Sequence, residues 1–162
     1  MSTTIILSIV IISLLCIVPI VIISRRNKKA ERAFKEKLFE FGKVHQGNID
    51  QSDFLNNLAI GYASNTHSVF FIKTKKDQEI MEVIKLNEIA TCQLSKPMRR
   101  SVDGTSSTID RIELNFVSKN KDGQTKRFVL YDLESDSLSL QGELQLAEQW
   151  HVILSEKLKR GL

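Results

Sequence analysis

The sequence predicts an α+β protein, in which one N-terminal transmembrane helix precedes an antiparallel β-sandwich or barrel that ends in an amphipathic helix. Three observations carry this prediction. Residues 4–24 contain no charged side chain, residues 59–132 hold short apolar runs separated by polar turns, and residues 140–160 repeat apolar side chains at helical spacing. The expected parts of the chain are a transmembrane helix at 4–24, a basic juxtamembrane helix at 25–43, a linker at 44–57 and a soluble domain at 58–162.

Residues 4–24 are long enough to cross a bilayer as a helix. A run of about twenty apolar residues, rising about 1.5 Å each, matches the roughly 30 Å hydrocarbon core of a membrane. A cleaved signal peptide is the alternative, but it carries its positive charge before a shorter apolar stretch. Here the charge follows the run, as Arg25, Arg26, Lys28 and Lys29. These four cations are expected to contact anionic lipid headgroups.

The distribution of Lys and Arg predicts the orientation of the chain. Residues 25–37 hold seven cations and two acids, whereas the segment before the apolar run has no charged side chain. The positive-inside rule then leaves the N-terminus outside and the C-terminal domain in the cytoplasm, with the chain crossing the inner (cytoplasmic) membrane once. The two cysteines, Cys16 and Cys92, give no disulfide framework and suit a reducing compartment.

The soluble part of the chain is close to electrically neutral. Residues 38–162 hold 16 of the 23 Lys and Arg and 17 of the 19 Asp and Glu, which leaves a net charge of −1. A nucleic-acid-binding domain needs a basic stripe on the folded domain itself. We therefore expect membrane lipids and a protein at the membrane as partners, and no nucleic acid.

Residues 30–41 predict an amphipathic helix, and residues 44–57 predict a linker. In the helix, Phe34, Leu38 and Phe41 share one face. Two interpretations are equally open, since this face can dock on the domain as core or lie along the membrane surface. Residues 44–57 are polar and contain several turn-forming side chains, which is typical of a connection into a domain.

The middle of the chain predicts antiparallel strands joined by short turns. In the best-defined hairpin, apolar and polar side chains alternate along 112–116 and again along 128–132, and Asp122-Gly123 lies in the turn between them. The expected strands are 59–63, 69–74, 79–86, 89–95, 112–116 and 128–132.

The last segment, residues 140–160, predicts a helix with one apolar face. That face carries Leu140, Leu144, Ala147, Trp150, Leu154 and Leu158. A single Trp on such a face is expected to be a structural plug, because burial of so large a side chain contributes more than any other in the domain. Stacking on a ligand is the alternative role for Trp150.

Four segments carry a resemblance to a known superfold: AIGYASNTHSVFFIK at 59–73, EVIKLNEIATCQL at 82–94, IDRIELNFVSKNKDGQTKRFVLYDL at 109–133 and GELQLAEQWHVIL at 142–154. Short antiparallel strands that end in one helix with a central Trp resemble the pleckstrin-homology-like (PH-like) superfold. The chain looks like a membrane-anchored bacterial PH-like protein of an uncharacterised Bacteroidota-type family. The resemblance implies a helix that plugs one end of the sheet, and loops that bind lipid headgroups, peptides or proteins.

Residues that could carry chemistry are few. The GxSxG, Walker and GxGxxG motifs are absent from the sequence, and the three His are scattered without metal-ligand spacing. Cys92 lies among strand residues and is expected to be an inert core thiol rather than a nucleophile. We therefore expect no enzyme, no cofactor and no metal site.

The segment 96–108 is the candidate contact site. It is longer than a usual hairpin connection, is predicted to be a flexible loop, and carries Lys96, Arg99 and Arg100 beside Met98. These cations could meet an anionic partner or a lipid headgroup, or the segment could be an ordinary solvated loop.

Together these features predict a single-pass membrane protein that presents a cytoplasmic PH-like interaction domain, a non-catalytic protein-binding or scaffold module. The first alternative is an anionic-lipid-sensing domain that uses the 96–108 loop, and the second is an enzyme of unrecognised type.

Overall fold

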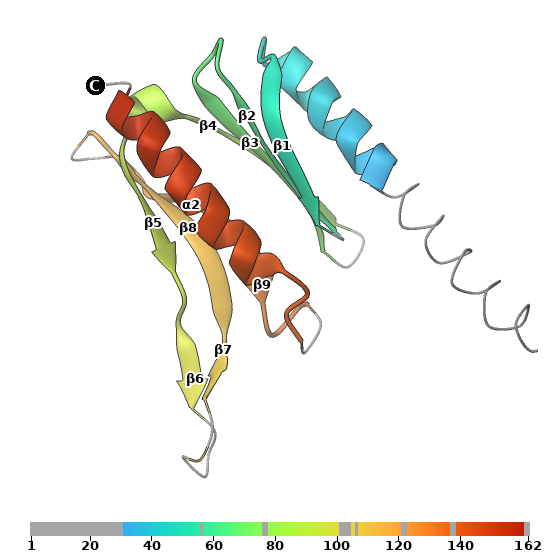
Figure 1. Ribbon diagram of the computed structural model, residues 1–162, viewed down its shortest axis with the longest axis vertical. Helices are drawn as coiled ribbons and strands as arrows, with labels where there is room; N and C mark the ends of the chain where they lie inside the picture. Colours follow the sequence, from blue (N-terminus) through green and yellow to red (C-terminus); the bar gives the residue numbers. More distant parts are fainter. Residues whose placement is uncertain are drawn as a thin grey trace, which may run out of the picture.

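The structure, a computed structural model, describes residues 31–55, 57–75, 78–100, 105, 107–120, 123–136 and 139–160. Over these residues the chain is an α+β protein with mainly antiparallel sheets and a C-terminal helix, which confirms the predicted class at that level (Figure 1). The predicted transmembrane helix at 4–24 and the cations Arg25, Arg26, Lys28 and Lys29 lie outside the described residues. Among the helices that are described, none is both long and apolar enough to span a bilayer.

The first sheet consists of four antiparallel strands that follow one another in the chain. They are β1 (Ile49–Leu55), β2 (Leu58–Ala63), β3 (Ser68–Lys75) and β4 (Gln78–Lys85), in that order across the sheet. A turn over residues 64–67 joins β2 to β3, and His67 ends it with a φ of 47°. His is one of the side chains that tolerate this left-handed region, so the polar turn SNTH suits the position.

The second sheet consists of three antiparallel strands. These are β5 (Ile89–Ser95), β8 (Arg111–Ser118) and β9 (Lys126–Asp132), with β8 in the middle. A short 3₁₀ helix, η1 (Leu86–Glu88), connects β4 of the first sheet to β5 of the second. All the neighbouring strand pairs of the two sheets are antiparallel.

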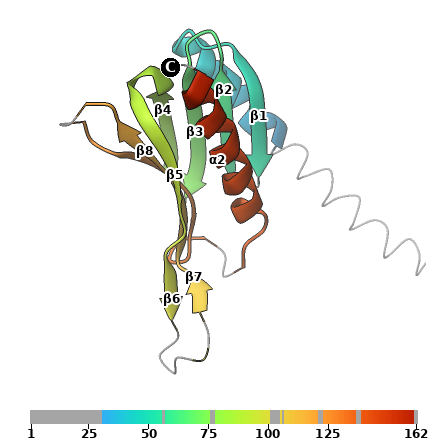
Figure 2. The ribbon, with the colours of Figure 1, turned by 60° about the vertical axis from the view of Figure 1, so that its left-hand side comes forward.

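The predicted loop at 96–108 is wrong in part, because both of its ends are paired strands. Strand β6 (Met98–Arg100) pairs with β7 (Ser107–Ile109), and the resulting ribbon projects away from the two sheets (Figure 2). The prediction of a loop depended on the length of the segment and on its Ser, Thr and Gly content. Thr108 and Ile109 have β-branched side chains, which favour strands, and the prediction did not take this into account.

The main core lies between the two sheets and the C-terminal helix α2 (Glu143–Arg160), which begins three residues later than the predicted start at 140. Its aromatic side chains join the sheets directly. Phe71 of β3 stacks on Phe128 of β9 with ring centroids 4.8 Å apart, and Phe116 of β8 meets Phe128 edge-on at the same distance. Trp150 of α2 is fully buried in this core.

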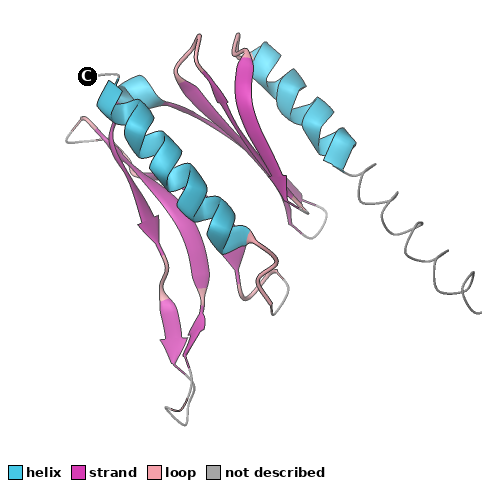
Figure 3. Cartoon of the chain, in the orientation of Figure 1, coloured by secondary structure: helices cyan, strands magenta, loops and turns pink. Residues whose placement is uncertain are grey.

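A second, smaller core lies on the other face of the first sheet. The helix over residues 31–44 covers that face, so the layers follow as helix, four-stranded sheet, and then α2 with the three-stranded sheet (Figure 3). Leu38 is fully buried there against Ala59, Phe70 and Ile72. Of the two interpretations of this helix, the structure therefore supports docking on the domain as core.

The predicted linker at 44–57 is wrong, because β1 occupies residues 49–55. The strand was missed because its sequence, IDQSDFL, is mostly polar, as suits a strand at the edge of a sheet. Its acids have partners within the fold. The backbone N–H of Ser64 donates to Asp50 at 2.7 Å, and hydrogen bonding with Ser64 lowers the pKa of the Asp50 carboxyl. The folded domain thus begins well before residue 58.

Candidate functional site

Two of the three cations predicted to contact a partner are paired within the domain. Lys96 Nζ lies 3.0 Å from a carboxylate oxygen of Glu148 on α2. Arg99 Nη2 lies 2.8 Å from Asp110 and 3.3 Å from Glu134. Arg100 is exposed on β6 and forms no ion pair with any residue that the structure describes. The ribbon therefore offers an external anion one unengaged cation rather than three.

Trp150, predicted as the structural plug, has no exposed surface, so its ring is not open to a ligand from solvent. Its indole Nε1–H donates to a carboxylate oxygen of Asp53 at 2.9 Å, and Gln149 donates to the same oxygen at 3.3 Å. Sequence reasoning missed Asp53 because it lies in the segment assigned to the linker, far from Trp150 along the chain. The contact joins α2 to β1.

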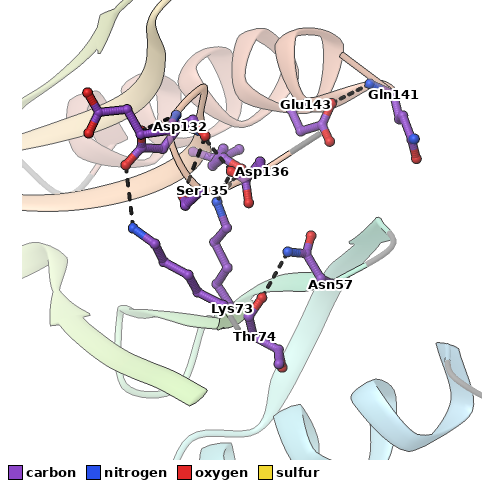
Figure 4. A network of polar contacts seen from close by, with 11 residues as sticks. Asn57, Lys73, Thr74, Asp132, Ser135, Asp136, Gln141 and Glu143 are labelled. Carbon is purple, nitrogen blue, oxygen red and sulfur yellow. Dashed lines mark hydrogen bonds and ion pairs between the residues drawn. The ribbon is translucent and has the colours of Figure 1, made fainter. Parts of the chain in front are cut away.

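A buried lysine fastens the first sheet to the end of β9. Lys73 on β3 is 2 % exposed, and its Nζ donates to the Leu130 carbonyl at 2.9 Å and to Asp136 at 2.7 Å (Figure 4). Asp136 also accepts a hydrogen bond from the backbone N–H of Asp132 at 2.8 Å. A buried charge that is paired and hydrogen-bonded in this way is satisfied. The network therefore holds the two sheets in a fixed relation and is not itself a free binding site.

Strand β4 is the last strand of the first sheet, and β9 is the last strand of the second. Among the described strands, neither has a neighbour on its outer side, whereas β5, at the other edge of the second sheet, lies beside α2. Ile80 and Met81 on β4 are 38 % and 42 % exposed. An unpaired strand edge presents free N–H and C=O groups that can pair with another chain.

Residues of both edge strands line one cavity of about 590 Å³. Its lining comprises Glu82 and Val83 of β4, Arg111 of β8, and Lys126, Arg127 and Val129 of β9. Its volume falls within the range of about 300–1,000 Å³ that is typical of ligand pockets. We call this the cationic cavity, because three of its six lining residues are positively charged and one is negatively charged.

The three cations of this cavity, Arg111, Lys126 and Arg127, have no acid within ion-pair distance among the described residues. Their side chains form no hydrogen bond or ion pair with another residue in the described part of the chain, and the buried Nε of Arg111 has no hydrogen-bond partner there. Arg111 interacts electrostatically with Asp132 at longer range. Burial raises the pKa of the Glu82 carboxyl, while the charge of Lys126 acts in the opposite direction. The cavity thus combines a surplus of positive charge with unused hydrogen-bond donors.

A second cavity, of about 530 Å³, lies on the other side of β4. It is lined by Val44, His45, Gln46, Thr66, Ser68, Val83, Lys85 and Asn87. We call it the polar cavity. The hydroxyl of Thr66 is buried and has no hydrogen-bond partner among the described residues. Val83 lines both cavities, so the free edge of β4 has a hollow on each side.

The remaining residues that could carry chemistry do not form a reactive site. Cys92 is buried, and burial raises the pKa of its thiol to about 12, so the thiol stays protonated near neutral pH. His67 lies 3.1 Å from the hydroxyl of Tyr62, at the end of the β2–β3 turn. The described residues contain no group of three or more His, Cys, Asp or Glu that could hold a metal ion.

Comparison with protein-family models, with curated protein sequences and with solved structures finds no match to this chain.

Sequence reasoning missed the cationic cavity because its walls come from three strands of two different sheets. One signal was present, since Lys126 and Arg127 directly precede the strand predicted at 128–132. Their proximity to Glu82 and Arg111 depends on how the sheets pack, which strand alternation alone does not specify.

Proposed function

We propose that this chain is a single-pass protein of the inner membrane that presents a PH-like domain in the cytoplasm, and that this domain binds a protein partner without catalysing a reaction. The uncharged run at 4–24 and the four cations that follow it support the anchor and its orientation. Antiparallel strands followed by one amphipathic helix, with Trp150 in the core, support the PH-like assignment.

One observation carries the proposed function: the free edge of β4 has a cavity on each side. Strand addition to an exposed sheet edge is a common mode of peptide recognition, in which main-chain hydrogen bonds supply affinity and side-chain pockets supply specificity. Successive side chains of a strand point to opposite faces of its sheet. A strand added to β4 can therefore place alternate side chains in the cationic cavity and in the polar cavity.

The structure favours a protein partner over the lipid-sensing alternative. That alternative depended on Lys96, Arg99 and Arg100, of which the first two already pair with acids of the domain. Lipid sensing at the ribbon would require those ion pairs to break. Binding at the β4 edge requires no existing strand pairing to break, since that side of β4 is unpaired among the described strands.

The proposal is tested by placing a photo-crosslinking amino acid at Met81 in the full membrane-embedded chain. The matched control places it at Val152, which is 56 % exposed on α2. We expect one discrete adduct from position 81 and none from position 152. Absence of any protein adduct from positions 81, 152 and 98, the last being the exposed Met98 of the ribbon, would contradict a protein-binding function.

A further inference from the structure

We infer that the partner contributes an extended acidic segment, which adds to the free edge of β4 as a strand and places its carboxylates in the cationic cavity. This inference rests on the proposed function and specifies the chemistry of the partner. It follows from the charge of the cavity, from the alternation of side chains along a strand, and from the composition of the rest of the chain.

The charge of the cationic cavity matches a carboxylate. The lining holds Arg111, Lys126 and Arg127 against one acid, Glu82, so it carries a surplus of two positive charges when Glu82 is ionised. Asp132, which lies outside the lining, interacts electrostatically with Arg111. A guanidinium donates two parallel hydrogen bonds to a carboxylate, and such charge-assisted bonds are about twice as strong as neutral ones.

The two cavities define the pattern of side chains in the bound strand. Residues on one face of the added strand enter the cationic cavity, and the residues between them enter the polar cavity. The lining of the polar cavity includes hydrogen-bonding side chains such as His45, Ser68 and Asn87, so it suits small polar side chains. We therefore expect an acid at every second position, with small polar residues such as Thr between them.

The N-terminal part of this chain cannot supply the acidic strand. Residues 1–30 contain four cations and no acid, so their charge is opposite to the one required. A second copy of the domain is a separate possibility. Crosslinking from position 81 distinguishes it, because the adduct would then contain two copies of this chain.

A synthetic peptide of five Thr-Glu repeats, labelled with a fluorophore, serves as the probe. Its binding to the full chain in uncharged detergent micelles is followed by fluorescence anisotropy. The matched control peptide has Gln in place of every Glu. Two further peptides carry N-methyl groups on all Thr residues or on all Glu residues. In an added strand the amides of one of these two sets point toward β4, so methylation of that set removes the pairing.

We expect the Thr-Glu peptide to bind, the Thr-Gln peptide to bind at least tenfold more weakly, and at least one N-methylated peptide to lose binding. Arg127→Gln and Lys126→Gln should each weaken binding of the Thr-Glu peptide about tenfold, because each removes a charged hydrogen-bond donor to the bound carboxylates. The matched control is Arg100→Gln, which removes an exposed cation of the ribbon. It should leave the affinity unchanged.

The other possible results show whether the acidic strand, the strand addition or the protein-binding function itself is wrong. A partner crosslinked from position 81, together with equal binding of the Thr-Glu and Thr-Gln peptides, overturns the acidic strand and leaves the protein-binding function standing. Binding that survives both N-methylated sets overturns strand addition. Crosslinking of position 81 only to a second copy of the chain replaces the acidic partner by self-association. Absence of a protein adduct from every tested position overturns the proposed function and the inference together.

Discussion

Two groups of three cations differ in what the fold places beside them. The ribbon cations are Lys96, Arg99 and Arg100, and the cavity cations are Arg111, Lys126 and Arg127. Two of the ribbon cations form ion pairs with acids of the domain. The cavity cations form none with the described residues, although they line one cavity together.

The difference shows that a cation which stands out in the sequence is not always free to bind an external acid in the folded protein. A cation in a surface segment with acids nearby forms exposed ion pairs, each of which contributes at most about 1 kcal/mol. Cations that share a cavity with one acid repel each other instead. The second group can bind an external acid without first breaking an internal pair, so the cavity is the better candidate for recognition.

The cationic cavity needs the two sheets to keep a fixed relation, so the largest expected effect comes from disrupting the core that joins them. Trp150→Ala should cost about 3–5 kcal/mol, because it empties the site of a fully buried Trp. A small domain has only about 5–15 kcal/mol of stability, so the melting temperature should fall sharply or the domain should unfold. Thermal and urea unfolding of the full chain in micelles measure this loss.

Fluorescence offers an independent check on Trp150, which is the only Trp in the chain. Its emission should be blue-shifted in the native protein and should move to longer wavelength on unfolding. For the unfolding measurements, the matched control is Trp150→Phe. It keeps an aromatic ring in the core and should therefore lower the free energy of unfolding by less than Trp150→Ala does. A red-shifted native spectrum with an unchanged melting temperature would contradict the packing of α2.

The next largest effect should come from the buried ion pair that fastens β3 to the end of β9. Lys73→Met leaves Asp136 without its cation in a site where both side chains are largely buried. We expect a loss of about 3 kcal/mol, since removal of one partner leaves an uncompensated charge. Urea unfolding measures the loss. The double variant with Asp136→Leu should recover part of it.

Lys75→Met is the matched control for this pair. Lys75 lies 3.5 Å from Asp132 and its side chain is 39 % exposed, so its loss should cost less than about 1 kcal/mol. Equal destabilisation by Lys73→Met and Lys75→Met would mean that the buried pair does not fasten the sheets.

The strands and α2 were largely predictable from the sequence, because their signals are local. Alternation along 112–116 and 128–132 and the helical period after residue 140 each depend on side chains only a few positions apart. Strand β1 gave no such signal. Its acids are explained by partners distant in sequence, such as Ser64 and the indole N–H of Trp150.

The candidate site could not be predicted for the same reason. The sequence indicated Arg99 and Arg100 because they stand in a long connection, and the acids that pair with Arg99 come from elsewhere in the chain. The cationic cavity depends on which edge strands meet. Charge along the chain does not contain that information, and only the packing of the two sheets provides it.

Removing one cation from each group should change the stability of the domain by small amounts of opposite sign. Arg99→Gln removes ion pairs to two acids and should destabilise the domain by about 0.2–1 kcal/mol. Arg127→Gln removes a cation that lines a cavity with two others, so stability should be unchanged or should rise. Thermal unfolding at low salt measures both, and the difference should shrink at about 1 M salt, where charges are screened. A loss for Arg127→Gln as large as that for Arg99→Gln would place an internal partner beside Arg127.

The smallest expected effect concerns Glu82, the one acid of the cationic cavity, and it appears as a dependence on pH. Because burial raises the pKa of Glu82 above its ordinary value of 4.5, the folded state binds the proton more strongly than the unfolded state does. The stability of the native protein should therefore fall as pH rises from about 4.5 through the higher pKa of the folded state. Glu82→Gln has no such proton, so its melting temperature relative to the native protein should be higher at pH 7 than at pH 4. The same change removes the negative charge from the cavity and should tighten binding of the Thr-Glu peptide at pH 7. A relative melting temperature that is lower at pH 7 than at pH 4 would mean that Glu82 stabilises the fold as a partner of the cavity cations, and that these cations are less available to an external acid.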